Sequence, residues 1–250
     1  MAEFHAEIDV SIVIPCYNEE ENIGKMLAAF NAAFSGDSGG VEIIFVDNGS
    51  TDGTCELLQK SVSDFPFANF VHLPENLGYG HGILAGLAAA KGKITGYMHG
   101  DMQVLPESVL EIARSVSSTG KNEPFFFKAR RYGRSFSEVF FTLGMTLFCS
   151  ILFRSWLADI NAQPTFFRKN FLADAGNFPR DFSFDLYLYL LAKKKGIRLI
   201  RKPVRVYQRA RGVSSWNRGI FSKFVLSIAF MKAALNIRRT LGLMDQKQGI

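Results

Sequence analysis

The chain has 250 residues, of which 48% are hydrophobic and 21% are charged. This length and balance predict one large globular domain with a proper core. The three cysteines lack metal-ligand spacing and predict free thiols in a reducing compartment. The N-terminus predicts no signal peptide, and the charges interrupting every apolar run predict no simple membrane span.

Positive charge is concentrated at the C-terminal end. Residues 191–250 hold 15 of the 29 Lys and Arg residues and one of the 23 acidic residues, a balance of +14, which leaves −8 for residues 1–190. This polarity favours an anionic partner. Charge alone fits a nucleic acid, a membrane surface or a phosphate-bearing substrate.

The first half of the chain alternates between strand and helix patterns. We expect strands at 10–14, 41–46, 70–73 and 94–99, and helices at 20–34, 51–62, 82–90 and 107–116. Such alternation predicts an α/β fold with a mostly parallel central sheet and helices on both faces.

The second half is richer in aromatic and basic residues. We expect strands at 125–129, 165–168 and 198–206, helices at 185–195 and 219–241, and a strongly apolar segment at 136–153. We interpret residues 1–215 as one domain with halves at about 8–120 and 121–215, followed by an amphipathic extension at 216–250. The two apolar segments fit core or dimer helices, or helices lying in a membrane interface.

Polar or Gly-rich residues follow each of the first four expected strands, where open α/β sheets bind ligands. The first two groups are Pro15, Tyr17, Asn18 and Glu19, and Asp47, Asn48 and Gly49. Asp47 is placed to bind a base or a ribose. Ser50 or Thr51 would cap the next helix, and both functions can hold together.

The third group, Asn76, Gly78 and Gly80, has glycines that would let a ligand approach the backbone before a helix. The fourth group is His99-Gly100-Asp101-Met102-Gln103. We expect Asp101 and Gln103 to alternate at the strand end and to offer hard oxygen ligands to Mg²⁺ or Mn²⁺, with substrate phosphates completing the shell.

Together the four groups resemble family 2 GT-A glycosyltransferases, closest to the dolichol-phosphate mannose synthase and polyprenyl-phosphate glycosyltransferase branch. The family patterns P-x-Y-N-E, D-D-G-S-x-D-G-T, N-x-G-x-G and D-A-D-x-Q match at 15–19, 47–54, 76–80 and 99–103. Two residues depart from them: Asn48 replaces the second acid of the D-D pair, and His99 replaces the first acid of the metal motif. The resemblance implies that Asp101 and Gln103 keep the metal contact, while His99 either touches the metal or nucleotide or only packs.

The resemblance extends to about residue 215 and implies an acceptor side. Asp159 precedes a segment like D-x-x-S-G-F-R, and Asp185 starts a helix where family members place a catalytic acid. Asp185 is the candidate general base for a hydroxyl acceptor, whereas a phosphate acceptor needs cations instead. Arg209 and Arg211 are candidates to clamp a phosphate or pyrophosphate.

The resulting hypothesis is a metal-dependent inverting glycosyltransferase. It would move a sugar from a nucleotide-diphosphate sugar to a polyprenyl phosphate at the cytoplasmic face of an anionic membrane, without a nucleic-acid partner. One alternative is transfer to a hydroxyl of a lipid-linked or soluble glycan. A second is a catalytically silent nucleotide-sugar binding module. A nucleotidyltransferase ranks lower, because residues 14–24 lack its Gly-rich basic loop. A homo-oligomer is compatible with each of these.

Overall fold

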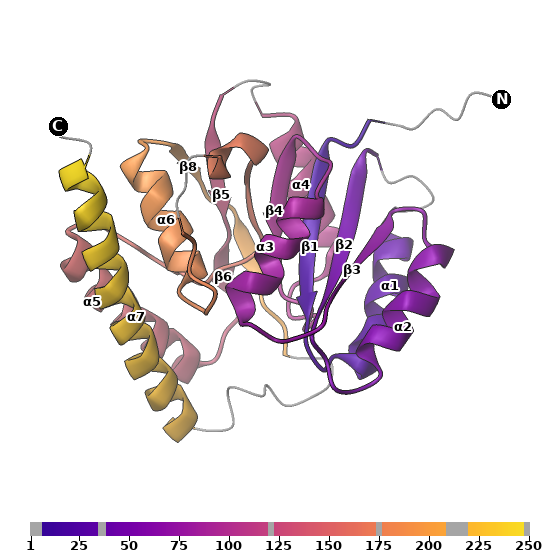
Figure 1. The fold of residues 1–250 in the computed structure, drawn as a ribbon, viewed down its shortest axis with the longest axis horizontal. Coiled ribbons are helices and arrows are strands. Elements are labelled where there is room, and N and C mark those ends of the chain that lie inside the picture. Colours follow the sequence, from indigo (N-terminus) through magenta and orange to yellow (C-terminus); the bar gives the residue numbers. More distant parts are fainter. Residues whose placement is uncertain (1–6, 35–38, 120–122, 174–176, 209–219, 248–250) are drawn as a thin grey trace.

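A seven-stranded sheet forms the centre of the protein (Figure 1). The computed structural model describes residues 7–34, 39–119, 123–173, 177–208 and 220–247. The strands lie in the order β3 (Ala68–Leu73), β2 (Val41–Asn48), β1 (Val10–Cys16), β4 (Ile94–Tyr97), β7 (Thr165–Arg168), β5 (Phe125–Lys128) and β8 (Arg198–Ile200). All neighbours are parallel except β7, which runs antiparallel to β4 and β5. The predicted mostly parallel sheet is confirmed.

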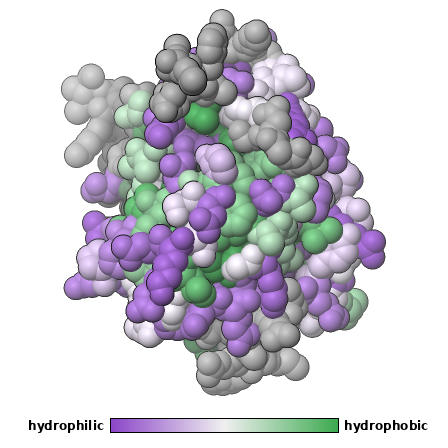
Figure 2. All heavy atoms as spheres, turned by 90° about the vertical axis from the view of Figure 1, so that its right-hand side faces the viewer, coloured by the Kyte–Doolittle hydropathy of each residue, from purple (hydrophilic) through white to green (hydrophobic). Residues whose placement is uncertain are grey.

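Two hydrophobic layers cover the sheet. Alternate strand residues face opposite sides, so Ile12 and Phe45 join one layer while Val13 and Ile44 join the other. The first layer packs under α1 (Glu20–Phe34) and α4 (Pro106–Ser117), and α2 (Thr54–Ser61) contacts α1. The second packs under α3 (Tyr79–Ala89) and α6 (Phe184–Lys194). On the side of α1 and α2, hydrophilic and apolar side chains are interspersed at the surface (Figure 2).

Two long helices, α5 (Phe136–Phe153) and α7 (Ile220–Lys247), pack against each other at the opposite end of the molecule (Figure 1). A capping box of Ser135 and Glu138 starts α5. Within the described residues, α5 is long and apolar enough to cross a membrane, and 11% of it is buried. Short strands β6 (Arg130–Tyr132) and β9 (Pro203–Arg205) pair with each other beside the sheet.

Several expected boundaries are wrong. The single strand expected at 198–206 is two strands, β8 and β9, which lie in different sheets. Helix α2 begins at Thr54 rather than 51, because the Ser50 Oγ and Thr51 Oγ1 atoms that would cap it bond to Asn18 instead. Helix α3 begins at Tyr79, so Gly80 lies inside the helix. Strand β4 ends at Tyr97, and the segment that carries Asp101 and Gln103 is a loop rather than a strand end.

Candidate active site

The loops after β1 and β2 are locked together by hydrogen bonds. The Asn18 amide N–H donates to Ser50 Oγ at 3.1 Å, and the Thr51 amide N–H donates to Asn18 Oδ1 at 2.9 Å. The Glu19 amide N–H donates to Thr54 Oγ1 at 2.8 Å. Asn18 adopts a φ of 55°, which Asn tolerates better than most residues. The structure therefore joins the first two predicted groups into one edge, with Pro15 and Tyr17 partly exposed beside it.

Asp47 is fully buried, and both of its carboxylate oxygens have partners. Oδ1 accepts from the Ser50 amide at 3.0 Å, and Oδ2 lies 2.8 Å from Nδ1 of His72, the residue opposite Asp47 on β3. Burial raises the pKa of Asp47, but the hydrogen bonds of Ser50 and His72 outweigh it and lower the pKa. Asp47 can therefore contact a nucleoside only by exchanging a partner, and that role remains a prediction.

Asp47 also belongs to a group that the sequence did not indicate. With Cys55 and His72 it places three potential metal-ligand atoms within 4.8 Å of one another. Sulfur and imidazole ligands suit a softer cation than Mg²⁺. The register of His72 against Asp47 could have identified that pair, but not Cys55 from α2.

The glycines of the second and third groups serve close packing between loops. A Cβ atom on Gly49 would lie 2.4 Å from the Asn76 backbone nitrogen. One on Gly78, whose φ is 111°, would lie 2.4 Å from the Arg180 carbonyl oxygen. Gly80 meets the backbone of residue 179 in the same way, and Asn48 Nδ2 donates to the Gly78 carbonyl at 3.1 Å. Packing between the loops therefore accounts for these glycines, and their contact with a ligand remains a prediction.

The fourth group surrounds a small cavity of about 30 Å³. Buried Asp101 accepts a hydrogen bond from the Gln103 amide at 3.1 Å, and Gln103 pairs through its backbone oxygen with the Tyr207 amide at 2.8 Å. Gly100 packs on Ile14 of β1. The lining residues are Met98, His99, Asp101, Gln103, Val104, Arg131, Asn161, Gln163 and Val206.

This cavity fits a hard divalent cation. Its lining offers a carboxylate and several amides, the donor set that Mg²⁺ and Mn²⁺ prefer. Two further oxygens, Asn161 Oδ1 and Gln163 Oε1, are buried and have no hydrogen-bond partner among the described residues. The sequence analysis missed both, because they lie about 60 positions from the metal motif and reach it only through the fold.

Beside the small cavity, Asp159 holds two arginines. Its Oδ1 accepts from Arg131 Nε at 2.8 Å, and its Oδ2 accepts from the Arg131 amide at 2.8 Å. Arg134 Nη1 lies 3.6 Å from Asp159 Oδ1. Burial raises the pKa of Asp159, but Arg131 and then Arg134 outweigh it and lower the pKa. Arg134 Nε is buried without a partner among the described residues. The basic run at 130–134 was the available signal for these residues.

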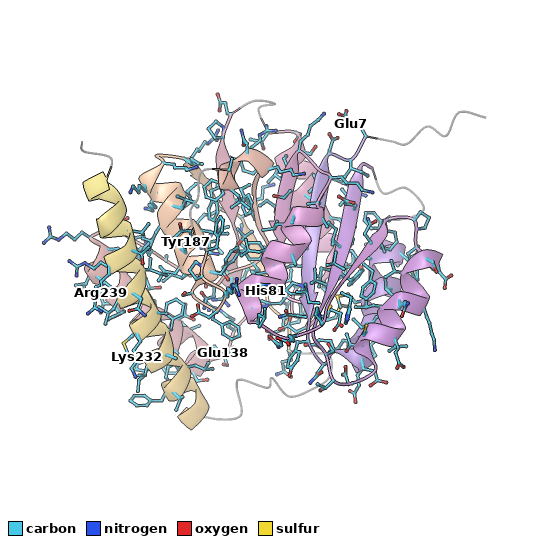
Figure 3. All side chains as sticks on the ribbon, viewed as in Figure 1. Glu7, His81, Glu138, Tyr187, Lys232 and Arg239 are labelled. Carbon is cyan, nitrogen blue, oxygen red and sulfur yellow. The ribbon has the colours of Figure 1, made fainter. Side chains whose placement is uncertain are left out.

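A larger cavity of about 400 Å³ lies between α5, α7 and residues 181–183. It shares Gln103, Arg131, Asn161 and Val206 with the small cavity. Arg134 lines one part, and the rest is mostly apolar, with Phe141, Met145, Leu226, Phe230 and Ala233. Glu138 on α5 also lines it (Figure 3). The two cavities together join the candidate cation site, two guanidinium groups and a mostly apolar wall.

Asp185, at the start of α6, is 2% exposed and belongs to a buried hydrogen-bond network. Its Oδ1 accepts from Lys128 Nζ and from the Tyr97 hydroxyl, both at 2.9 Å, and its Oδ2 accepts from the Tyr79 hydroxyl at 3.1 Å. Burial lowers the pKa of Lys128 in spite of Asp185. Asp185 lines neither of the two cavities. Arg209 and Arg211 lie outside the described residues.

Two curated relatives match part of this chain. A 39% identical stretch of 114 residues, 45% of this chain and 32% of the relative, matches undecaprenyl-phosphate 4-deoxy-4-formamido-L-arabinose transferase of Pseudomonas fluorescens (strain Pf0-1). Dodecaprenyl-phosphate galacturonate synthase of Rhizobium johnstonii is 33% identical over 41% of this chain and 30% of the relative. The matched stretches therefore span about a third of these curated relatives.

Solved structures confirm the GT-A fold. Glucosyl-3-phosphoglycerate synthase of Mycobacterium tuberculosis, with Mn²⁺, UDP and glucosyl-3-phosphoglycerate, matches with a TM-score of 0.70 and 19% identity over 92% of this chain and 79% of that chain. A Pyrobaculum calidifontis mannosyltransferase with GDP-Man and Mn²⁺ has a TM-score of 0.61 and 18% identity over 98% of this chain and 77% of that chain. The model of glycosyl transferase family 2 matches residues 11–158. The chain belongs to glycosyl transferase family 2.

Proposed function

We propose that this protein transfers a sugar from a nucleotide-diphosphate sugar to a polyprenyl phosphate, with inversion and with a divalent cation. Arg134 carries the proposal. Its guanidinium is largely buried, its Nε has no partner among the described residues, and it lines the cavity between α5 and α7. An anionic ligand would supply the acceptor that Nε lacks, and it would suit two guanidinium groups, Arg131 and Arg134, that share the carboxylate of Asp159. The apolar remainder of that cavity suits a lipid chain.

The chemistry is a single displacement. An oxygen of the acceptor phosphate attacks the anomeric carbon, and the bond from that carbon to the nucleoside diphosphate breaks, with its electron pair leaving on the diphosphate. Arg131 and Arg134 would hold the acceptor phosphate, and Asp159 would orient both arginines. A divalent cation, held by Asp101, Gln103 and the neighbouring amides, would neutralise the charge of the departing diphosphate.

A hydroxyl acceptor is less well supported, because it needs a general base. Asp185 is buried, ion-paired with Lys128 and outside both cavities. A phosphate is already ionised and needs no base. The names of the curated relatives, which include undecaprenyl phosphate and dodecaprenyl phosphate, point to the same acceptor class.

The acceptor class implies a membrane, and α5 offers a surface for one. Its apolar residues Phe136, Phe140, Leu143, Leu147 and Ile151 are 59–86% exposed and recur every three or four positions along one side. We propose that this stripe enters the interface of an anionic bilayer, at its cytoplasmic face.

The test follows nucleoside diphosphate release from a panel of nucleotide sugars with Mn²⁺, with and without undecaprenyl phosphate. We expect release with one donor that depends on the lipid phosphate. Arg134→Gln should raise the KM for undecaprenyl phosphate at least about tenfold, whereas Arg130→Gln, at an exposed position, should not. No release with any donor would refute transfer and favour a binding module, and release only with glycan hydroxyls would refute the phosphate acceptor.

A further inference from the structure

We propose that Gln163, through Oε1, is a ligand of the divalent cation beside Asp101 and Gln103, and that Tyr79 and Asp185 are positioning residues that fix its amide. This inference rests on the proposed metal-dependent transfer. It places one ligand of the cation in the segment just before β7, outside the four strand-end groups. Asn161 Oδ1 lies in the same cavity as a second available oxygen.

The orientation of the Gln163 amide follows from a chain of hydrogen bonds. Asp185 is ion-paired with Lys128 at 2.9 Å, and an ionised carboxylate only accepts. The Tyr79 hydroxyl must therefore donate its single proton to Asp185, at 3.1 Å.

The phenol oxygen of Tyr79 is left as an acceptor, and Gln163 Nε2 donates to it. A reversed amide would place Oε1 against an oxygen that has no proton to give. Nε2 is thereby assigned to the Tyr79 side, and Oε1 is turned away from it.

Oε1 of Gln163 is buried and has no partner among the described residues, in a side chain that is 3% exposed. An unsatisfied buried carbonyl costs about 1–3 kcal/mol unless a ligand supplies the missing interaction. Gln163 lines the small cavity with Asp101 and Gln103, so a cation there would supply it.

A Gln163 ligand would also compensate for the acid that is missing from the metal motif at position 99. His99 stands where the family pattern has an acid, and its ring centroid lies 5.6 Å from that of Tyr79. A hard cation gains little from a neutral imidazole compared with a carboxylate. Gln163 supplies a neutral oxygen in a cavity whose acidic partner is Asp101.

The experiment measures Mn²⁺ affinity of the full chain by electron paramagnetic resonance, with UDP or GDP present. We expect the wild type to bind Mn²⁺ and Gln163→Leu to weaken binding at least about tenfold. Gln163→Glu, which keeps an oxygen at the site, should bind Mn²⁺ more tightly than Gln163→Leu. Gln59→Leu, an exposed glutamine on α2, is the matched control and should change nothing.

Tyr79→Phe separates positioning from general structural damage. In the wild-type background it should weaken Mn²⁺ binding, because the amide is no longer oriented. In the Gln163→Glu background it should have little effect, because a carboxylate has two equivalent oxygens. An equal loss of Mn²⁺ affinity in both backgrounds would refute the positioning argument. If Gln163→Leu fails to fold, this comparison of Tyr79→Phe in the two backgrounds is the test of the inference.

The outcomes distinguish this inference from the proposed function. If the wild type binds no Mn²⁺ with either nucleotide, both the proposed metal dependence and this inference are refuted. If the wild type binds Mn²⁺ and a folded Gln163→Leu binds it within twofold as tightly, only the inference is overturned.

Discussion

The buried ion pair between Lys128 and Asp185 offers a sharp test of what Asp185 does. The two side chains are 0% and 2% exposed, and Nζ lies 2.9 Å from Oδ1. Removing one partner of such a pair costs about 3–5 kcal/mol, because the other charge stays buried without compensation. We therefore expect Lys128→Met and Asp185→Asn each to lower the free energy of unfolding by about that much.

The double variant should lose much less than the sum of the single variants. With both charges gone, the remaining cost is that of neutral hydrogen bonds to Tyr97 and Tyr79, about 2 kcal/mol. Equilibrium unfolding in urea at pH 7 gives all three values, and because the single costs sum to at least about 6 kcal/mol we expect a coupling energy of at least about 4 kcal/mol. Additive effects, or a cost below about 1 kcal/mol for Lys128→Met, would refute the buried ion pair.

The same variants separate a general base from a positioning residue. If Asp185 takes a proton from the acceptor, the double variant stays as inactive as Asp185→Asn although it regains stability. If Asp185 only holds Tyr79, turnover with undecaprenyl phosphate recovers together with folding. We expect recovery, because a phosphate acceptor has no proton to remove.

Three further perturbations test other parts of the structure. Asp159→Asn should lower the free energy of unfolding by about 3 kcal/mol at pH 7. Because the folded pKa of Asp159 is lowered, urea unfolding should show this difference at every pH above the ordinary pKa and lose it as the pH falls through the folded pKa. A difference that does not change with pH would contradict this. Gly78→Ala should cost about 2 kcal/mol in the same assay, because its φ is 111° and a Cβ would meet the Arg180 carbonyl, whereas Gly24→Ala, with open space around it in α1, should cost nothing. Leu143→Glu/Leu147→Glu on α5 should reduce flotation with anionic liposomes at least about a hundredfold, while Asn31→Glu on α1 should not; equal flotation of both would exclude the α5 stripe as the membrane surface.

Much of the α/β framework followed from periodicity. Helix α1 matches its expected bounds of 20–34, because Ile23, Met26, Leu27 and Phe30 recur at helical spacing and are all buried. The starts of α2 and α3 did not follow, because they depend on contacts with other loops: Asn18 takes the groups expected to cap α2, and the backbone of residues 179–180 packs on the first turn of α3.

The site residues also differ in whether the local sequence could identify them. The groups at 47–49 and 99–103 could be identified because each follows its own strand, so local sequence carries the signal. The basic run at 130–134 was a local signal for Arg134, and the register of β3 against β2 relates His72 to Asp47. Gln163 had no such signal, because its place depends on a pairing between distant segments. The antiparallel pairing of β7 with β4 brings Gln163 towards the metal motif, and no local pattern at 161–168 indicates that pairing.

The distribution of positive charge is the remaining link between sequence and function. The C-terminal excess predicted an anionic partner, yet the arginines that line the proposed acceptor cavity, Arg131 and Arg134, come from the middle of the chain. Lys232, Arg238 and Arg239 instead lie exposed on α7, which packs on α5 (Figure 3). A cation near an anionic bilayer contributes about 1 kcal/mol, whereas one beside a bound phosphate acts through directed hydrogen bonds. Under the proposed function the two groups of cations would have different tasks. Arg131 and Arg134 would bind the acceptor phosphate, and the cations of α7 would attract anionic lipids while the apolar stripe of α5 enters the membrane interface.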